Sequence, residues 1–307
     1  MTRPGRLGFG ILGAGRVGAV LGSALRGAEH AVVGAHTVSE GSAERVEAML
    51  PGVPLLDIPE LLRRSEAVLI AVPDDALEPL VAGLAEAGQW RAGQLVIHTS
   101  ARFGVDALSP AREAGCIPLA INPVMAFTGT SLDVARLQDA SFAVSADPMM
   151  LPVAQALVVE MGGEPVVVEE EDRALYAAAL ALVSEPLGAV AGAAWDALHA
   201  VGVEDPARMM NPLLRAGVEN ALMAGPDAGR SASVAREPGR VASAMRAWAV
   251  AGADATAVGD SLAGASVASA GAGYAALVRA ATARALSRGD IGAERAAAVL
   301  DALGPNH

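Results

Sequence analysis

One stretch near the N-terminus sets the architecture of the chain: Leu7-Gly8-Phe9-Gly10-Ile11-Leu12-Gly13-Ala14-Gly15-Arg16-Val17-Gly18. An apolar run leads into three glycines with the spacing G-x-G-x-x-G, and residues 16–25 continue with the period of a helix. Strand, glycine turn and helix in this order are the context that gives the spacing its meaning. Gly13 permits the tight turn, Gly15 lets backbone approach a pyrophosphate, and Gly18 lets the helix lie close to the strand.

The start of the following helix provides the groups that would bind phosphate. Ala14, Arg16 and Val17 lie between the glycines, where unpaired N–H groups and a partial positive charge favour phosphate. A tight strand–helix turn without a ligand is the alternative interpretation. We predict that residues 13–18 bind a dinucleotide.

Composition excludes several classes of protein. The 307 residues carry a net charge of −12, which argues against nucleic acid and against anionic membrane surfaces as partners. The single cysteine, Cys116, excludes disulfides within the chain and thiolate metal clusters, and we expect no metal site. Residues 1–6 lead into the first predicted strand without the pattern of a signal peptide, so we expect a cytoplasmic protein.

Strand and helix patterns alternate through the first half of the chain. This alternation predicts a doubly wound, mainly parallel α/β Rossmann sheet over residues 1–168, covered by helices on both faces. Strand signals stop near Glu169, and an all-α domain is predicted over residues 169–307. The predicted strands cover residues 31–35, 55–56, 67–72, 95–98 and 117–121, with additions at 141–145 and 166–168.

Such a sheet binds ligands beyond the carboxyl ends of its strands. The segments expected at that edge, besides the glycine turn, are Val72-Pro73-Asp74, His98-Thr99-Ser100 and Asn122-Pro123. We assign Val72, Pro73, Asp74 and Thr99 to the cofactor site.

The end of the second strand distinguishes NAD from NADP. An NAD site usually has an Asp or Glu there, whereas this strand ends in Ala35-His36-Thr37-Val38-Ser39. A 2′-phosphate could accept hydrogen bonds from His36, Thr37, Ser39 or Arg16. We therefore favour NADP, while His36 has an alternative interpretation as an ordinary loop histidine.

The second half of the chain is rich in alanine. Between Ala174 and Trp195 the only charged residue is Glu185, a length that could span a bilayer. Because a charge near the centre of a span is costly, we expect a buried helix in a homodimer core and no membrane span. Small residues dominate 251–273, as suits close helix packing.

Three residues are candidates for catalysis. Asn122 could orient a substrate oxygen, His98 could donate a proton, and Glu185 in an apolar helix would have a raised pKa and act as an acid. Each has a structural alternative. Asn122 before a proline could be a turn residue, His98 could hold a strand end, and Ser184-Glu185-Pro186 could cap a helix that restarts after a kink.

The chain resembles the Rossmann-like proteins with a C-terminal DUF2520 domain. The resemblance rests on residues 13–18, Ala71-Val72-Pro73-Asp74-Asp75, His98-Thr99-Ser100, Arg173-Ala174-Leu175-Tyr176 and Gly273-Tyr274. That family belongs to the 6-phosphogluconate dehydrogenase-like group and is similar to ketopantoate reductases and pyrroline-5-carboxylate reductases. The resemblance implies NADP-linked reduction of a small carbonyl or imine, such as a ketopantoate-like 2-oxo acid. It also implies that the helical domain supplies dimer contacts and part of the substrate pocket.

Several positions depart from the family pattern. Ala101 stands where the family has Gly, Asn122 where it has His, Arg173 where it has Lys, and Ser184-Glu185 where it has Ser-Asn. The cofactor half is intact while polar groups of the substrate half differ. Two hypotheses follow: an NADP-dependent oxidoreductase with a different substrate, and a non-catalytic NADP-binding sensor or regulatory dimer.

Overall fold

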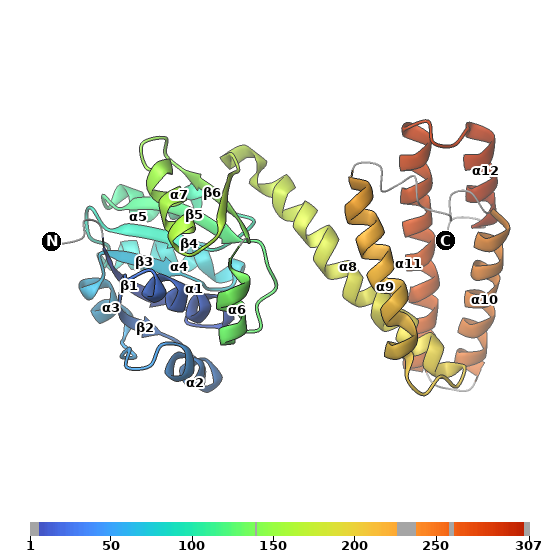
Figure 1. The fold of residues 1–307 in the computed structure, drawn as a ribbon, viewed down its shortest axis with the longest axis horizontal. Helices are drawn as coiled ribbons and strands as arrows, with labels where there is room; N and C mark the ends of the chain where they lie inside the picture. Colours follow the sequence, from blue (N-terminus) through green and yellow to red (C-terminus); the bar gives the residue numbers. More distant parts are fainter. Residues whose placement is uncertain (1–5, 139, 226–237, 258–260, 304–307) are drawn as a thin grey trace. The chain divides into compact units, whose positions relative to one another are not determined.

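The computed structural model describes residues 6–138, 140–225, 238–257 and 261–303, without the side chains of residues 185, 186 and 251–269. The chain forms two compact units, Met1–Leu180 and Ala181–His307 (Figure 1). The first holds the sheet, and the second consists of helices.

The first unit is built on a seven-stranded sheet with the order β2-β1-β3-β4-β5-β6-β7. The first five strands run parallel, β6 is antiparallel to β5, and β7 is parallel to β6. The strands are β1 (Gly8–Leu12), β2 (Ala31–His36), β3 (Ala67–Ile70), β4 (Leu95–His98), β5 (Ile117–Pro123), β6 (Ser141–Ala146) and β7 (Glu164–Val167).

Helices connect the strands and cover both faces of the sheet, as predicted. They are α1 (Arg16–Gly27), α2 (Glu40–Met49), α3 (Ile58–Arg64), α4 (Asp74–Glu86), α5 (Ser109–Glu113), α6 (Ser131–Arg136) and α7 (Leu151–Glu160), with the short 3-10 turns η1 (Val105–Leu108) and η2 (Glu170–Asp172).

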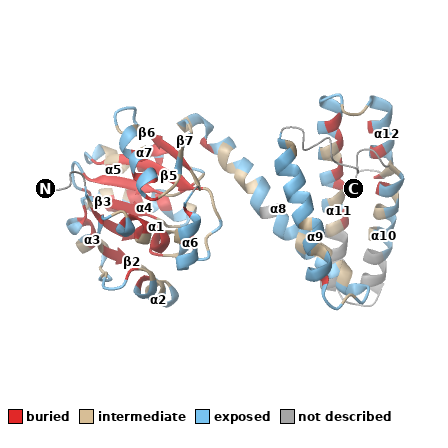
Figure 2. Cartoon of the chain, viewed as in Figure 1, coloured by how far each residue is buried: buried red, intermediate tan, exposed pale blue. Residues whose placement is uncertain are grey.

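The apolar strands bury side chains on both sides, which is why the sequence shows continuous runs there. Phe9 and Ile11 of β1 belong to a core with α1, while Leu12 belongs to a second core with α3 and α4. Val68 and Ile70 of β3 also belong to the second core. Figure 2 shows the resulting buried centre of the sheet.

Two predicted strands are absent or shorter in the structure, and β7 covers Glu164–Val167 where residues 166–168 were predicted. The pair Leu55-Leu56 is not a strand, since it forms an isolated bridge between Leu55 and Ala35. The bridge is held by hydrogen bonds from Ala35 to Pro54 and from Leu56 to Ala35, after which Asp57 caps α3. The strand predicted over 67–72 ends at Ile70, because Pro73 turns the chain into α4.

The second unit contains most of α8 (Arg173–Ala200) and all of α9 (Pro206–Ala224), α10 (Pro238–Ala257), α11 (Ser261–Ser287) and α12 (Ala293–Ala302). The last three pack together around Val241, Val278 and Val299. Helix α8 runs without interruption through residues 184–186, so the interpretation of Ser184-Glu185-Pro186 as the start of a new helix was wrong.

Helix α8 joins the two units, and the structural division falls inside it, after Leu180. The predicted division at residues 168/169 coincides with the end of the strand pattern. Among the described residues, the segment Glu170–Ala200 is the one helical stretch long and apolar enough to cross a membrane by length and composition. None of its most apolar part is buried within the chain.

Candidate cofactor and active site

The glycine turn joins the ends of three neighbouring strands. The N–H groups of Gly13 and Ala14 donate to the carbonyl of His36 at 3.0 and 3.1 Å, which ties β1 to the end of β2. Gly13 has φ +91°, and a Cβ there would lie 2.7 Å from the carbonyl oxygen of Ala71. A Cβ on Gly18 would lie 2.4 Å from the carbonyl oxygen of Gly13. Both positions therefore require glycine for packing alone.

Gly15 is different. It is the N-cap of α1, and a Cβ built there would meet nothing within 4 Å. No side chain caps this helix end, and its first turn has no acidic residue. The N–H groups of residues 16–18, in the first turn of α1, have no acceptor among the described residues. Open space at Gly15 beside such a helix N-terminus fits the phosphates of a dinucleotide. Arg16 is exposed beside it, and Val17 is half-buried.

The end of β2 carries the predicted selector residues. The half-buried His36 uses Nδ1 to donate to the carbonyl of Leu56 at 2.9 Å, so one side of its ring is held. Thr37 is half-buried, and Ser39 caps α2 by accepting a 3.3 Å hydrogen bond from the N–H of Ser42. Residues 36–39 include no carboxylate that would pair with ribose hydroxyls.

The segment after β3 lies directly against the turn. A Cβ on Gly13 would stand 3.0 Å from Cγ1 of Val72, and Pro73 is the N-cap of α4. Asp74 is the first residue of that helix. The strand ends that were predicted to meet at one edge of the sheet do so. Thr99, just after β4, lies at this edge too, because its N–H donates to the carbonyl of Ile70 at the end of β3.

His98 does not fit the expected role of proton donor. Its side chain is completely buried, Nδ1 accepts a 3.2 Å hydrogen bond from the N–H of Ser100, and Nε2 donates to the carbonyl of Gly104 at 2.8 Å. Burial lowers its pKa to about 4, despite the opposing hydrogen bond to Gly104. His98 is therefore a neutral group that holds the turn after β4.

Asn122 lies at the centre of a polar cluster. Its Nδ2 donates to the carbonyl of Thr99 at 3.0 Å, and its Oδ1 accepts a 2.7 Å hydrogen bond from the hydroxyl of Tyr176. Tyr176 stands on the first turns of α8 and is half-buried. Burial raises the pKa of the Tyr176 hydroxyl, while the nearby Arg173 acts in the opposite direction. The cluster presents an amide, a phenol and the half-buried Thr99 beside the glycine turn.

Arg173 supports this cluster from inside the protein. It is 1 % exposed, its Nε donates to Oγ of Ser145 at 2.8 Å, and its guanidinium carbon lies 5.8 Å from the centre of the Tyr176 ring. Nη2 reaches the carbonyls of Ala120 and Ala143 at 3.4 and 3.3 Å. Because its guanidinium is bonded to residues of β5 and β6, Arg173 holds the start of α8 against the sheet.

Tyr176, Arg173 and Ser145 were missed as site residues in the sequence. The match of residues 173–176 to the family was the available signal, but nothing in the sequence indicated that Tyr176 faces Asn122. The side chain of Glu185 lies outside the described part of the structure, so its predicted role stays a prediction.

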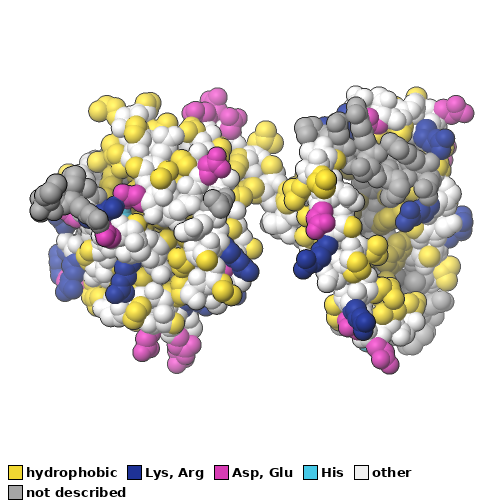
Figure 3. Space-filling view, viewed as in Figure 1, with side chains coloured by type: hydrophobic (Ala, Val, Ile, Leu, Met, Phe, Trp, Pro, Cys, Tyr) yellow, Lys and Arg dark blue, Asp and Glu magenta, His cyan; other side chains and the backbone are white. Residues whose placement is uncertain are grey.

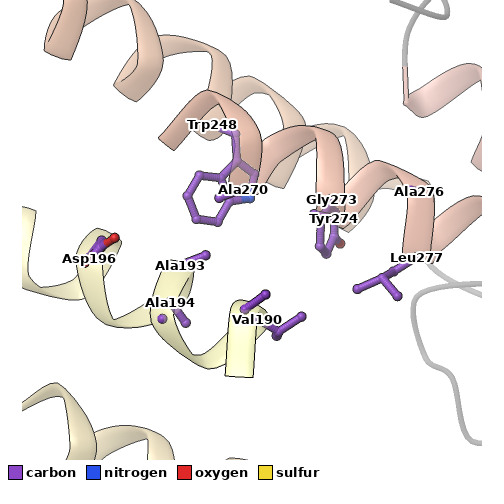
Figure 4. A pocket seen from close by; sticks show the side chains of 12 residues that line it. Val190, Ala193, Ala194, Asp196, Trp248, Ala270, Gly273, Tyr274, Ala276 and Leu277 are labelled. Atoms are coloured by element: carbon purple, nitrogen blue, oxygen red, sulfur yellow. The ribbon is translucent and has the colours of Figure 1, made fainter. Parts of the chain in front are cut away.

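The helical unit has a pocket of its own, with a volume of about 730 Å³. Its walls come from α8, α10 and α11, with Trp248 and Tyr274 facing it and Asp196 among the residues of α8 that line it (Figure 4). Its lining is mostly apolar, and the described residues that line it include no cation for a phosphate. Within the described residues, no group of three or more His, Cys, Asp or Glu side chains could hold a metal ion.

Comparison with known proteins finds solved structures with a similar fold. The folds most like this one include a Bacteroides fragilis protein assigned as a candidate NADP oxidoreductase, with TM-score 0.65, 16% identity, and coverage of 85% of this chain and 98% of that one. A Thermotoga maritima protein whose name states no activity gives TM-score 0.59, 16% identity, and coverage of 91% and 99%. An imine reductase from Myxococcus stipitatus, solved with NADP+, gives TM-score 0.51, 16% identity, and coverage of 71% and 76%.

These likenesses show the fold. No curated protein matches the chain. Residues 1–123 match the model of a Rossmann-like domain, and residues 140–258 match the domain of unknown function DUF2520. The chain is therefore a Rossmann-like protein with a C-terminal DUF2520 domain.

Proposed function

We propose that the protein is an NADP-dependent oxidoreductase that reduces a small carbonyl or imine substrate, such as a ketopantoate-like 2-oxo acid. The observation that carries this proposal is the position of two features at one edge of the sheet. The open space at Gly15 fits a dinucleotide, and the cluster of Thr99, Asn122 and Tyr176 lies at the neighbouring strand ends.

Residues 13–18 would form the pyrophosphate site, with the N-terminus of α1 facing the negative charge. The N–H groups of residues 16–18 would bind the phosphate oxygens, because those of Gly13, Ala14 and Gly15 already donate to carbonyls within the turn and at the end of β2. When bound, a nicotinamide cofactor supplies the hydride for such a reduction. The absence of an acid at residues 36–39 favours NADP over NAD, because a carboxylate there would repel a 2′-phosphate. His36, Thr37 and Ser39 are the proposed contacts at that end.

Reduction of a C=O or C=N group also needs a proton and an oriented substrate. Asn122 uses one N–H of its amide for Thr99 and keeps the other for a substrate oxygen or nitrogen. The Tyr176 hydroxyl, which donates to Asn122, can transfer its proton to a substrate placed beside the amide. The guanidinium of Arg173 near the Tyr176 ring favours the phenolate left behind.

His98 serves in this proposal as a positioning residue, since it fixes the turn that carries Thr99. Glu185 remains a second proposed acid on α8. If Tyr176 donates the proton, Tyr176→Phe should have low turnover. If Glu185 donates it, Glu185→Gln should have low turnover instead.

A non-catalytic NADP-binding sensor is the second candidate. The observation in its favour is that Arg173, at the position of the family's Lys, is buried and held by Ser145 and by backbone carbonyls. Such a residue contributes packing and no free amine to the site.

We also propose that the protein is a homodimer through its helical unit. Helices α8 and α9 expose large apolar side chains, which appear as hydrophobic surface in Figure 3. Monomeric proteins rarely expose large apolar patches, so these side chains favour an interface between copies of the chain. The exposed residues are Leu175, Leu182, Val183, Leu187, Val190 and Trp195 on α8, and Met209, Leu213, Val218, Leu222 and Met223 on α9.

A substrate screen tests the proposed activity. The full chain is incubated with NADPH and a panel of 2-oxo acids, branched oxo-pantoate-like acids and cyclic imines, and loss of absorbance by NADPH is recorded. Turnover with at least one class is expected. Tight NADPH binding without turnover on any member of the panel would favour the sensor.

A further inference from the structure

Two arginines from different helices meet at one point beside the glycine turn. Arg16 is the first residue of α1, and Arg45 lies in α2. The position of a Cβ built on Gly129 is 2.6 Å from Nε of Arg45 and 3.0 Å from Cγ of Arg16. Both side chains therefore lie against the same backbone segment.

That segment is held rigidly. The carboxylate of Asp133, completely buried, accepts 2.7 Å hydrogen bonds from the N–H groups of Thr128 and Gly129, and one of 3.0 Å from the Thr128 hydroxyl. Burial alone would raise the pKa of Asp133, but these hydrogen bonds outweigh it and lower the pKa. Gly129 has φ +81°, a conformation that favours glycine. The loop thus forms a fixed wall behind the two arginines.

Neither arginine is paired with an acidic side chain in the described residues. Within the described part of the chain, Arg16 and Arg45 make no ion pair and no side-chain hydrogen bond, and Asp133 pairs with Arg136 instead. Two positively charged side chains that lie against one loop repel each other, and an anion beside them removes this repulsion. A guanidinium suits a phosphate in particular, because its planar N–H groups match the phosphate oxygens.

The position of the pair identifies the anion. Arg16 directly follows the turn whose N–H groups bond to His36 at the end of β2, and α2 begins just after that strand end. A dinucleotide on this turn places its adenosine ribose at the end of β2. Phosphate at that place is the 2′-phosphate of NADP.

We infer that Arg45, together with Arg16 and backed by the loop of residues 128–130, binds the adenosine 2′-phosphate and makes the site selective for NADP. This inference rests on the proposed function, since it concerns the same cofactor site. It adds a specificity-determining residue, Arg45, from the middle of a helix outside the β2–α2 connection.

The test uses fragments that carry no nicotinamide: adenosine 2′,5′-bisphosphate and AMP, titrated calorimetrically into the full-length protein. Wild type is expected to bind the bisphosphate about 10- to 100-fold more tightly than AMP, as for hydrogen bonds between charged groups. Arg45→Ala should reduce that ratio to below about threefold and leave AMP affinity in place, and Arg45→Lys should retain part of it because the charge remains. Arg208→Ala, which removes the same charge from exposed surface on α9, is the matched control.

A wild-type ratio below about threefold, or an Arg45→Ala ratio equal to that of wild type, would overturn the inference. Thermal unfolding of each variant verifies that it is folded, and Arg45→Gln replaces Arg45→Ala if the latter is not. The substrate screen is a separate readout. A large fragment ratio without turnover removes the enzyme proposal and keeps Arg45, whereas turnover with no fragment ratio does the reverse.

Discussion

The hydroxyl of Tyr176 donates a 2.7 Å hydrogen bond to Oδ1 of Asn122, linking the first turns of α8 to the carboxyl end of β5. The residues are far apart in the chain, and both lie beside strand ends that surround the glycine turn. The contact gives an amide and a phenol that can act together on one substrate atom. Substitution of Tyr176 tests whether the two groups act in this way.

Tyr176→Phe should lower turnover by about 10²- to 10⁴-fold, as expected for loss of a proton donor. Cofactor affinity should be unchanged, because Tyr176 does not belong to the glycine turn. The measurement is steady-state kinetics once a substrate is known, together with NADPH titration. Tyr274→Phe, which alters the pocket of the helical unit, is the matched control and should keep full activity. Equal rates for Tyr176→Phe and wild type would exclude Tyr176 as the donor.

Glu185→Gln tests the second acid. If Glu185 donates the proton, turnover should drop by about 10²-fold or more while NADPH affinity stays the same. The helix-start alternative no longer applies, since α8 is continuous through this position. A loss below about threefold would remove Glu185 from the site and leave the Tyr176–Asn122 pair.

The elements that sequence predicted well are those specified by local pattern. The turn of residues 13–18 needs glycine for close contacts within one strand–turn–helix unit, so its spacing is visible in the sequence. The central strands β3 and β4 are continuous apolar runs because both of their faces are buried. Leu55-Leu56 has the same composition but too few residues, and it forms only a bridge.

The parts that sequence could not predict depend on contacts between distant segments. Tyr176 and Asn122 are separated by 54 residues, and Gly129 joins Arg16 to Arg45 from a third element. His98 has the residue type and strand position of an acid, but both of its ring nitrogens are hydrogen-bonded, to Ser100 and Gly104. A residue type and its strand position do not reveal which of its atoms are already bonded.

The burial of His98 predicts a dependence of stability on pH. Its pKa is about 4 in the folded protein, against an ordinary value of 6.5, so the unfolded chain binds the proton more readily between these pH values. The stabilisation is complete above pH 6.5 and is lost as pH falls toward 4. A shift of this size corresponds to about 3 kcal/mol of the free energy of unfolding.

Urea denaturation between pH 7 and 4 measures this effect. His98→Asn should flatten the acid limb of the stability curve, although it will lower stability at pH 7 because a buried hydrogen bond is lost. His199→Gln, at an exposed position on α8, is the matched control and should keep the wild-type slope. An unchanged slope in His98→Asn would show that another group governs the acid limb.

The dimer proposal predicts that the mass of the protein in solution depends on the apolar side chains exposed on α8. Leu182 and Val183 are 73 % and 74 % exposed within the chain, so light scattering should give a dimer mass at micromolar concentration. Leu182→Gln should weaken association, whereas Met149→Gln, at a still more exposed residue of the first unit, should not. A monomer mass for wild type would contradict the proposal.

The glycines of the turn provide the sharpest test of the cofactor site, because they differ in what a methyl group would meet. Gly15 faces open space at ordinary φ, so Gly15→Ala should leave the melting temperature unchanged while reducing cofactor affinity at least tenfold by occupying the phosphate position. In Gly18→Ala the new methyl group would lie 2.4 Å from the carbonyl oxygen of Gly13, and the protein should lose about 1–3 kcal/mol of stability.

Gly27→Ala is the matched control, since Gly27 ends the same helix and also faces open space. Calorimetric titration with NADPH and thermal unfolding of the three variants separate the two effects. If Gly15→Ala bound NADPH as well as Gly27→Ala does, the space in front of Gly15 would not be the phosphate site. The ligand would then have to be sought away from the N-terminus of α1, because every other group assigned to the cofactor was placed relative to this turn.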